Sequence, residues 1–221
     1  MKGKQTKPTS TCEWVKTEPV LGQKCTAQTF EELVSFDNLI ATFEFRANFL
    51  LQKTAMELSN RVMGDSKEHP LDAWNAVQPF YILDLAYSYG DLLLIRYTAE
   101  RLRALNDGKT DTGVNSDTKE ILNLLFKLDA LTRIFKGMSV WLEAEYLDGS
   151  HMQIIREGIM KINEAIKKHA VAYTYSILYD EDLIDSMLAP SDGELYKSIV
   201  QRVQSSPNAF SRISNWKELY E

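Results

Sequence analysis

The sequence predicts an all-α fold, an up-and-down bundle of four long helices followed by short C-terminal helical extensions. Apolar residues recur three or four positions apart over long stretches, which is the spacing of one helix face. Helix-starting residues and glycines separate these stretches. No stretch alternates apolar and polar residues with the period of two that a half-buried β-strand shows.

The first long helix is expected to run from Thr29 to about Met63. Thr29-Phe-Glu-Glu32 fits a capping box, in which the threonine and the glutamate satisfy each other's backbone N–H groups. Gly64-Asp65-Ser66 would end the helix, because glycine is common just past a helix C-terminus. One broad face would be apolar, made of Leu33, Phe36, Ile40, Phe43, Ala47, Leu50 and Leu51.

The second helix, Leu71 to Leu105, is expected to be central because its wide apolar stripe needs partners on two flanks. Pro79 would either start this helix or kink it, and Asn106-Asp107-Gly108 would stop it. One apolar row consists of Tyr81, Leu85, Leu92, Ile95, Ala99 and Leu102, and a neighbouring row of Ile82, Ala86, Tyr89 and Leu93. The opposite side would carry Asp84, Asp91, Thr98 and Arg101.

Two further long helices are expected. Asp117-Thr-Lys-Glu120 would cap the third helix, which would end near Asp148-Gly149. Ser150-His-Met-Gln153 would open the fourth, which would run on, or restart, from Ala170 to Tyr175. The apolar residues of the third helix are Ile121, Leu124, Leu125, Leu128, Leu131, Phe135, Met138 and Leu142, and those of the fourth are Ile155, Ile159, Ile162 and Ile166.

The two ends of the chain differ in character. Residues 1–28 are polar, and we expect a poorly ordered lead-in with order only around Trp14-Val15, followed by a helical domain over 29–221. Near the C-terminus we expect a segment from Glu181 to Leu188, a turn at Pro190-Ser-Asp-Gly, a helix from Glu194 to Ser205, and a turn of helix near Trp216.

Composition narrows the function classes. The formal charge of −6 and the pI near 5.2 argue against a nucleic-acid-binding protein, which normally carries a basic face. No apolar run approaches the roughly 20 residues of a membrane span. The only cysteines, Cys12 and Cys25, form no Cys-x-x-Cys pair, so a reducing compartment is expected, although a disulfide between them remains open.

The residues that could carry chemistry have simpler explanations. His69, His151 and His169 lack the spacing of a bundle metal site, so we expect surface or capping roles and no metal. No phosphate-binding loop or nucleophile elbow is present, and no catalytic residue is predicted. Glu143 and Glu145, and the acidic group Asp180, Glu181, Asp182 and Asp185, could be read as acid/base or cation sites, but a solvated helix end with acids in its first turn explains the acidic group more simply. A pocket remains open as a minor alternative for the tyrosines Tyr81, Tyr87, Tyr89, Tyr97, Tyr173, Tyr175 and Tyr179.

Five short motifs follow one another in the order, and at nearly the spacing, of one known family. They are Arg46-Ala47, Ala73-Trp74-Asn75, Ala170-Val171-Ala172, Asp192-Gly193-x-x-Tyr196 and Ser206-Pro207. On these motifs the stretch from Phe36 to Pro207 resembles the C-terminal helical region of the peroxisomal acyl-CoA oxidases.

The resemblance implies a family that uses FAD to introduce a trans-2 double bond into an acyl-CoA and returns the electrons to oxygen as hydrogen peroxide. The flavin-binding domains and the catalytic glutamate precede this region. We therefore expect the chain to pack on the flavin- and acyl-CoA-binding part and to support dimerisation, in a homodimer or with a full-length oxidase subunit. FAD and acyl-CoA are not expected to bind the chain alone. The alternative is a non-catalytic helical interaction module that partners a full-length oxidase.

Three features qualify the resemblance. Thr42-Phe-Glu-Phe-Arg-Ala-Asn48 looks like the family's catalytic Thr-Phe-Glu-Gly-Glu-Asn, but the register set by Ala73-Trp74-Asn75 and the mid-helix position of Glu44 argue against a catalytic role for it. The family's histidines in the second helix are replaced by Tyr87-Ser88-Tyr89. The family implies the peroxisome, but the sequence given ends Leu219-Tyr220-Glu221 instead of Ser-Lys-Leu. Import would then need a partner or a true C-terminus beyond this sequence, and the location is otherwise expected to be cytoplasmic.

Overall fold

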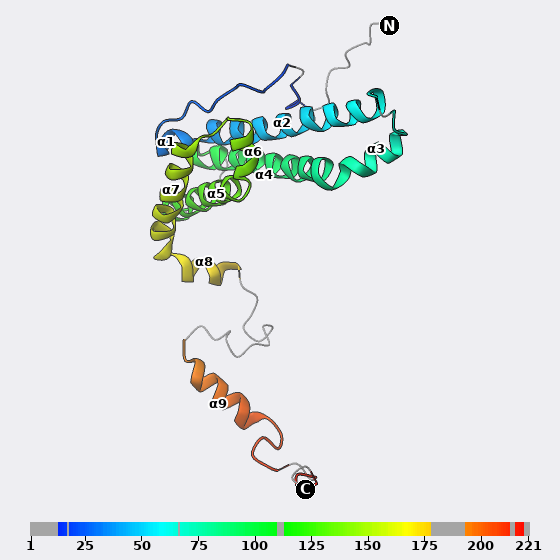
Figure 1. Cartoon of the computed structure of the whole chain (residues 1–221). Helices are drawn as coiled ribbons and strands as arrows, with labels where there is room; N and C mark the ends of the chain where they lie inside the picture. The colour runs from blue at the N-terminus through cyan, green and yellow to red at the C-terminus, as the bar shows by residue number, and fades with distance from the viewer. Residues whose placement is uncertain are drawn as a thin grey trace. The chain divides into compact units, whose positions relative to one another are not determined.

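A computed structural model shows an all-α protein (Figure 1), which confirms the predicted fold class. The structure describes residues 13–16, 18–65, 67–109, 113–177, 193–212 and 215–218, and none of these residues lies in a strand. The chain divides into two compact units, Met1–Lys168 and His169–Glu221.

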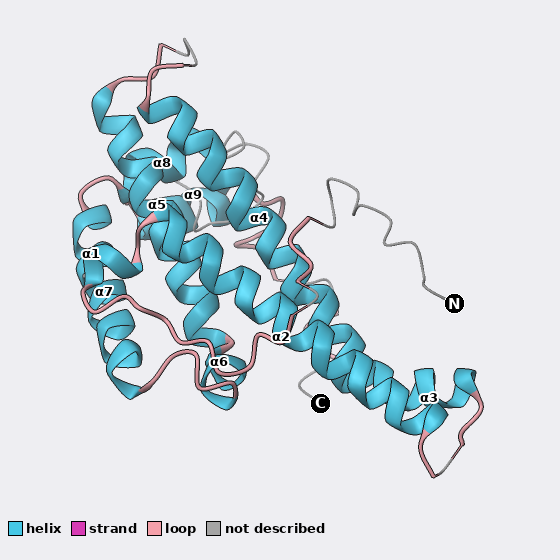
Figure 2. Cartoon of the chain, turned by 90° about the horizontal axis from the view of Figure 1, so that it is seen from above, coloured by secondary structure: helices cyan, strands magenta, loops and turns pink. Residues whose placement is uncertain are grey.

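The first unit contains all the long helices (Figure 2). The long helices pack consecutively, α2 against α4, α4 against α5 and α5 against α7, while α1 contacts both α2 and α7. The closed four-helix bundle stays a prediction. Along the chain the unit's elements are α1 Phe30–Leu33, α2 Phe36–Met63, α3 Pro70–Val77, the π-helix η2 Gln78–Ile82, α4 Leu83–Asn106, α5 Ser116–Lys136, α6 Met138–Glu143 and α7 Gly149–Lys167.

The second unit contains α8, Ala170–Ile177, and α9, Leu195–Ser205. The helix expected from Glu194 to Ser205 is therefore confirmed, and the Ala170 stretch restarts as a helix of its own. Residues 215–218 form a turn, whereas a helical turn was expected near Trp216. The predicted segment from Glu181 to Leu188 and the start of the turn at Pro190 lie outside the described residues.

The first predicted helix is broken once. Thr29 and Glu32 form the expected capping box, but α1 ends at Leu33. The side chain of Ser35 then accepts a hydrogen bond from the backbone N–H of Asn38, 3.3 Å away, and starts α2 anew. The prediction of one helix from Thr29 was wrong because serine, as a helix N-cap, competes with the continuing helical backbone.

The second predicted helix runs on without an intervening loop but changes type at Pro79. Proline has no N–H for the α-helical bond, and residues Gln78–Ile82 form a π-turn in which the N–H of Leu83 bonds to the carbonyl of Gln78. The helix axis bends there (Figure 1), as the kink prediction anticipated. Of the predicted apolar row, Leu92, Ile95, Ala99 and Leu102 are buried.

The third and fourth helices begin at other caps than predicted. Asn115, not Asp117, caps α5, because its carboxamide oxygen accepts from the N–H of Thr118 at 2.8 Å. α5 stops before Gly137 and α6 follows, whereas one helix was predicted up to Asp148. Asp148 and His151, not Ser150 and Gln153, form the capping box of α7.

The described part of the predicted lead-in is packed on the helices. Trp14, Val20, Cys25 and Ala27 belong to the hydrophobic core. Side-chain amides of α2 bind its backbone, since Asn48 Oδ1 accepts from the N–H of Lys16 at 2.7 Å and Asn48 Nδ2 donates to the carbonyl of Trp14 at 2.8 Å. The helices thus bury part of a segment that composition alone marks as a polar linker.

The close approach of α1 to α7 yields a test of the packing. A Cβ placed on Gly158 would lie 2.3 Å from the ring of Phe30, so we expect Gly158→Ala to lower the free energy of unfolding by about 1–3 kcal/mol through overpacking. Gly90→Ala, where the new Cβ meets open space within α4, should instead raise it by about 0.5–1 kcal/mol. Urea unfolding midpoints of the two variants check both signs, and equal effects would contradict the packing of α1 on α7.

Candidate functional site

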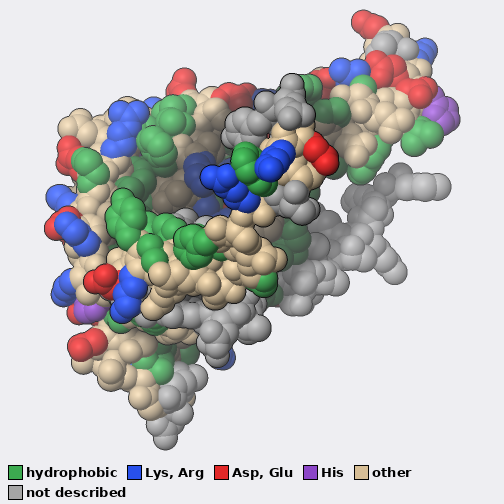
Figure 3. Space-filling model, turned by 90° about the horizontal axis from the view of Figure 1, so that it is seen from below, with side chains coloured by type: hydrophobic (Ala, Val, Ile, Leu, Met, Phe, Trp, Pro, Cys, Tyr) green, Lys and Arg blue, Asp and Glu red, His purple; other side chains and the backbone are tan. Residues whose placement is uncertain are grey.

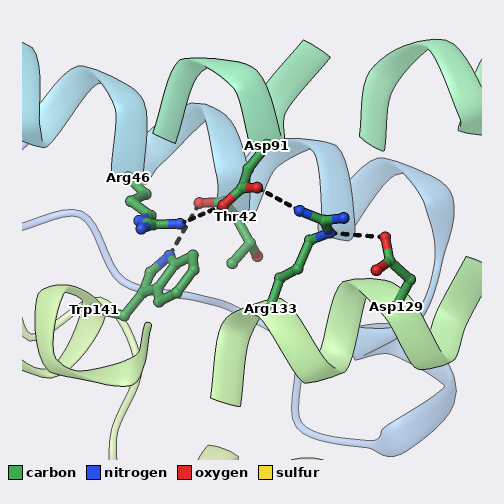
Figure 4. Close-up of polar contacts among 6 residues, drawn as sticks. All are labelled: Thr42, Arg46, Asp91, Asp129, Arg133 and Trp141. Atoms are coloured by element: carbon green, nitrogen blue, oxygen red, sulfur yellow. Dashed lines mark hydrogen bonds and ion pairs between the residues drawn. The ribbon is translucent and has the colours of Figure 1, made fainter. Parts of the chain in front are cut away.

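An ion-pair cluster joins three helices inside the first unit (Figure 4). Asp91 of α4 accepts from Arg46 of α2 at 2.9 Å and from Arg133 of α5 at 2.6 Å. Arg133 also donates to Asp129, one helical turn earlier on α5, at 2.8 Å. The side chains of Arg46 and Asp91 are only 11% and 20% exposed, so these charges are largely withdrawn from water.

Trp141 links α6 to the same cluster (Figure 4). Its indole N–H donates to the carbonyl of Thr42 at 3.1 Å, and the guanidinium of Arg46 lies 5.0 Å from its ring centroid. Arg46 Nε and the hydroxyl of Ser88 are buried with no hydrogen-bond partner among the described residues. The cluster thereby fixes α2, α4, α5 and α6 to one another.

This cluster has the character of a structural cross-link between helices and not of a reactive site. Two guanidinium groups and two carboxylates balance each other, and the hydrogen bonds that Arg133 donates to Asp129 and then to Asp91 raise the pKa of Arg133. No group is left as a general acid or base. Glu44, the residue in the catalytic-looking sequence, lies half-buried on α2 without a hydrogen bond or ion pair from its carboxylate to the described residues.

A cavity of about 440 Å³ opens beside Cys25. Burial raises the pKa of the Cys25 thiol, and the negative charge of Asp148 raises it further, so the thiol stays protonated and is a poor nucleophile. The cavity is lined by Lys24, Cys25, Gln28, Leu142, Glu145, Tyr146, Leu147, Asp148 and His151.

His151 fastens the N-terminal segment to α7 at the edge of this cavity. Its Nε2 lies 3.0 Å from the carbonyl of Ala27, and its Nδ1 lies 2.7 Å from Asp148 Oδ1. The hydroxyl of Ser150, and then the backbone and side chain of His151, lower the pKa of Asp148 well below its usual range. Beside Cys25, therefore, Asp148 and His151 cap α7, and His151 also tethers the N-terminal segment to that helix.

A second cavity, of about 410 Å³, is mainly apolar. It is lined by Pro19, Leu21, Phe49, Gln52, Lys53, Met56 and Glu143. Lys53 pairs with Glu143 at its rim and lies near the rings of Phe49 and Tyr81, 5.9 and 5.6 Å from their centroids. Lys53, the one cation among these lining residues, is thus already neutralised by Glu143.

Residues 54–87 form a helical hairpin, here called the arm, which extends from the rest of the first unit (Figure 2). The arm comprises the C-terminal half of α2, α3, η2 and the first turns of α4. Figure 3 shows hydrophobic side chains along it beside the charged residues at its tip. Its large exposed apolar residues are Met56, Met63, Leu71, Trp74, Phe80, Leu83 and Tyr87.

The other residues considered from the sequence do not converge. His69 caps α3 by accepting from the N–H of Leu71, and His169 is half-buried before α8. Within the described ranges, no group of three or more His, Cys, Asp or Glu side chains could hold a metal ion. None of the predicted tyrosines lines the two cavities above, and Tyr179 and the acids Asp180, Glu181, Asp182 and Asp185 lie outside the described residues.

Comparison with known sequences decides the family. The family model described as acyl-CoA oxidase matches residues 35–221. The chain belongs to the acyl-CoA oxidase family. Among family relatives it is 21% identical to human peroxisomal acyl-coenzyme A oxidase 3 over 200 residues, which covers 90% of this chain and 27% of the relative. It is 20% identical to peroxisomal acyl-coenzyme A oxidase 2 of Rattus norvegicus over 184 residues, covering 83% of this chain and 26% of the relative.

Solved acyl-CoA oxidases share the fold. An acyl-CoA oxidase from Lycopersicon esculentum (tomato) superimposes with a TM-score of 0.83 at 16% identity, over 98% of this chain and 31% of that one. Acyl-CoA oxidase-1 of Caenorhabditis elegans, solved with FAD and ATP, gives a TM-score of 0.75 at 17% identity, over 96% of this chain and 30% of that one. The chain thus spans about a quarter to a third of the length of these family members.

The described helices also bear on membrane attachment. Not one of them combines the length and the apolar character needed to cross a bilayer.

The ion-pair cluster predicts a large effect of a small change. Asp91→Asn keeps the shape of the side chain but leaves Arg46 and Arg133 without their shared counter-charge, so we expect a loss of about 2–3 kcal/mol in the free energy of unfolding. Asp37→Asn, in an ion pair whose carboxylate is 92% exposed, should cost less than about 1 kcal/mol. Equal losses in urea unfolding would show that the cluster is not a special cross-link.

The lowered pKa of Asp148 predicts a pH dependence. Because this pKa lies below the ordinary value of 3.8, the stabilising contribution is complete above that value and is lost as the pH falls through the folded-state pKa. The melting temperature of the natural protein should therefore exceed that of Asp148→Asn at neutral pH, and the gap should narrow as the pH falls below about 4. Asp84→Asn, with no ion pair to the described residues, serves as the control, and a gap that stays constant with pH would refute the assignment.

Proposed function

We propose that this chain is the C-terminal helical domain of an FAD-dependent acyl-CoA oxidase of peroxisomal fatty-acid β-oxidation. The reaction of the assembled enzyme would be acyl-CoA + O₂ → trans-2-enoyl-CoA + H₂O₂. The chain would pack on the flavin- and acyl-CoA-binding part and support dimerisation. Its family membership over residues 35–221, together with its share of the relatives' length, supports this role.

The observation that carries the proposal is a cross-linked body with a large apolar surface left uncovered. The cluster around Asp91 and the tether at His151 fix the helices internally. Seven large apolar side chains on the arm nevertheless face solvent in the isolated chain. Large apolar side chains exposed together on one segment are a feature of interaction sites.

The described residues do not fit a flavin by themselves. FAD carries a negatively charged pyrophosphate, which binds well at clustered backbone N–H groups or beside cations. The cavity beside Cys25 offers Lys24 but also the carboxylates of Glu145 and Asp148, which would repel that group. In the apolar cavity, Lys53 is already paired with Glu143. We therefore assign the flavin, the catalytic base and the acyl-CoA site to the part on which this chain packs.

The second candidate function is a non-catalytic interaction module that joins a full-length oxidase subunit. The uncovered arm suits this role as well, because it would dock on a separate polypeptide in the same way. In both cases the relatives' names support a peroxisomal setting, which the chain would reach together with its flavin-bearing partner. The two candidates differ only in whether the partner is part of the same polypeptide.

Two preparations of the chain together test the proposal. Produced alone in a foreign host, the chain should be colourless and release no peroxide from palmitoyl-CoA. Tagged and purified from its own source cells, it should carry a flavin absorption band and release peroxide. The mass of the tagged polypeptide then separates a domain from a partner module.

Two outcomes would overturn the proposal. A yellow, active chain from the foreign host would show that it is catalytically complete by itself. A colourless, inactive preparation from the source cells would show that no oxidase accompanies it.

A further inference from the structure

The arm completes its own packing without its exposed apolar residues. On α3, Ala73 and Val77 are fully buried on the side that packs against α2. Trp74, which follows Ala73 in the sequence, is 47% exposed, and Phe80 on the π-turn is 77% exposed. The tripeptide Ala73-Trp74-Asn75, noted in the sequence for its resemblance, is therefore only partly explained by the fold, which uses Ala73 and leaves the tryptophan outside.

The arm is also acidic. It holds five carboxylates against two cations, Arg61 and Lys67. Arg61 is bound by Glu57 and Glu68, at 2.9 and 3.4 Å. The remaining carboxylates, Asp65, Asp72 and Asp84, are exposed and make no ion pair with the described residues. The uncovered apolar surface thus lies among unneutralised negative charges.

This charge distribution separates the candidate occupants of the arm. In a two-fold symmetric dimer the same patch occurs on both subunits, so an arm against a second arm would bring carboxylates face to face. Like charges brought together at an interface are strongly unfavourable. The favoured partner is a different surface, apolar at its centre and carrying Lys or Arg at its rim. The relatives are about three to four times longer than this chain, so an oxidase of their length has ample polypeptide outside this domain to supply a surface of that kind.

We infer that the arm, residues 54–87, is the surface by which this chain docks on the flavin-bearing part of the oxidase. Trp74 and Phe80 act as the apolar anchors, since large aromatic side chains dominate binding at interface centres. Asp72 and Asp84 face basic side chains of the flavin-bearing part. The inference rests on the proposed function and adds to it the contact surface and the charge of the partner.

Hydrogen exchange on the active preparation from the source cells tests the docking surface. Amides of 70–87 should exchange at least about 10-fold more slowly in that preparation than in the chain produced alone, because a docked surface opens less often. Amides around Met160, an exposed residue of α7, serve as the reference and should change little.

Variants then test the anchors and the charges. Trp74→Ala with Phe80→Ala should lower flavin content per chain, and affinity for the flavin-bearing part, by about 10-fold or more. Asp72→Lys with Asp84→Lys should weaken docking and reduce its salt dependence. The control, Met160→Ala with Phe210→Ala, removes apolar side chains outside the arm that are at least as exposed, and should change flavin content by less than about 2-fold. Circular dichroism and urea unfolding confirm that each variant is folded.

The outcomes distinguish a failure of the proposed function from a failure of the docking surface. Absence of flavin from the natural preparation would overturn the proposed function. Flavin and activity with an arm that exchanges freely and tolerates both pairs of substitutions would overturn only the docking surface. A concentration-dependent dimer of the chain alone that Trp74→Ala with Phe80→Ala abolishes in sedimentation would show that a second copy covers the arm, and would also overturn it.

Discussion

The structure depends on one shared carboxylate. Asp91 neutralises Arg46 and Arg133 together, and so ties α4 to the helices on both of its flanks. Charges this far from water are tolerated only with partners, so each of the three helices supplies a charge that another of them neutralises. Trp141 extends the same cross-link to α6 by stacking under Arg46 and bonding to the carbonyl of Thr42. The helices otherwise meet mainly through apolar side chains and a few exposed polar pairs, and this cluster gives them a fixed register.

The cross-links and the arm have complementary roles. Side-chain amides of α2 and the ring of His151 hold the N-terminal segment against the helices, so the first unit has few loose parts near its core. The arm then presents an apolar, acidic surface on a well-supported base. A domain built in this way can contribute to an oxidase by contact alone, without placing any of its own groups near the reacting carbon.

The sequence predicted features that depend on local spacing. The all-α class, the burial of Leu92, Ile95 and Ala99, and the capping box at Thr29 all follow from helical periodicity and N-cap chemistry. Features set by distant partners were missed. Asp91 was expected to face away from the apolar stripe because its counter-charges, 45 and 42 positions away, are invisible to periodicity. Likewise, the side chain of Asn48 holds the polar N-terminal segment by hydrogen bonds to the backbone of Lys16 and Trp14, and composition does not predict such bonds. For the candidate site, the sequence predicted no catalytic residue, which stays a prediction, and the exposed side chain of Trp74 emerged only once α3 was placed on α2.

The π-turn at Pro79 sets the direction in which the arm presents its side chains. A π-turn holds one more residue than an α-helical turn, so it shifts the faces on either side of it by about 100°. Trp74 before the turn and Leu83 after it owe their relative orientation to that additional residue. The gain or loss of a single residue between Gln78 and Ile82 would therefore rotate α3 relative to α4 and expose other side chains on the arm, while the helices around Asp91 stayed unchanged. A one-residue change in length at this position would thus remodel the outer face of the arm without disturbing the cross-linked helices at its base.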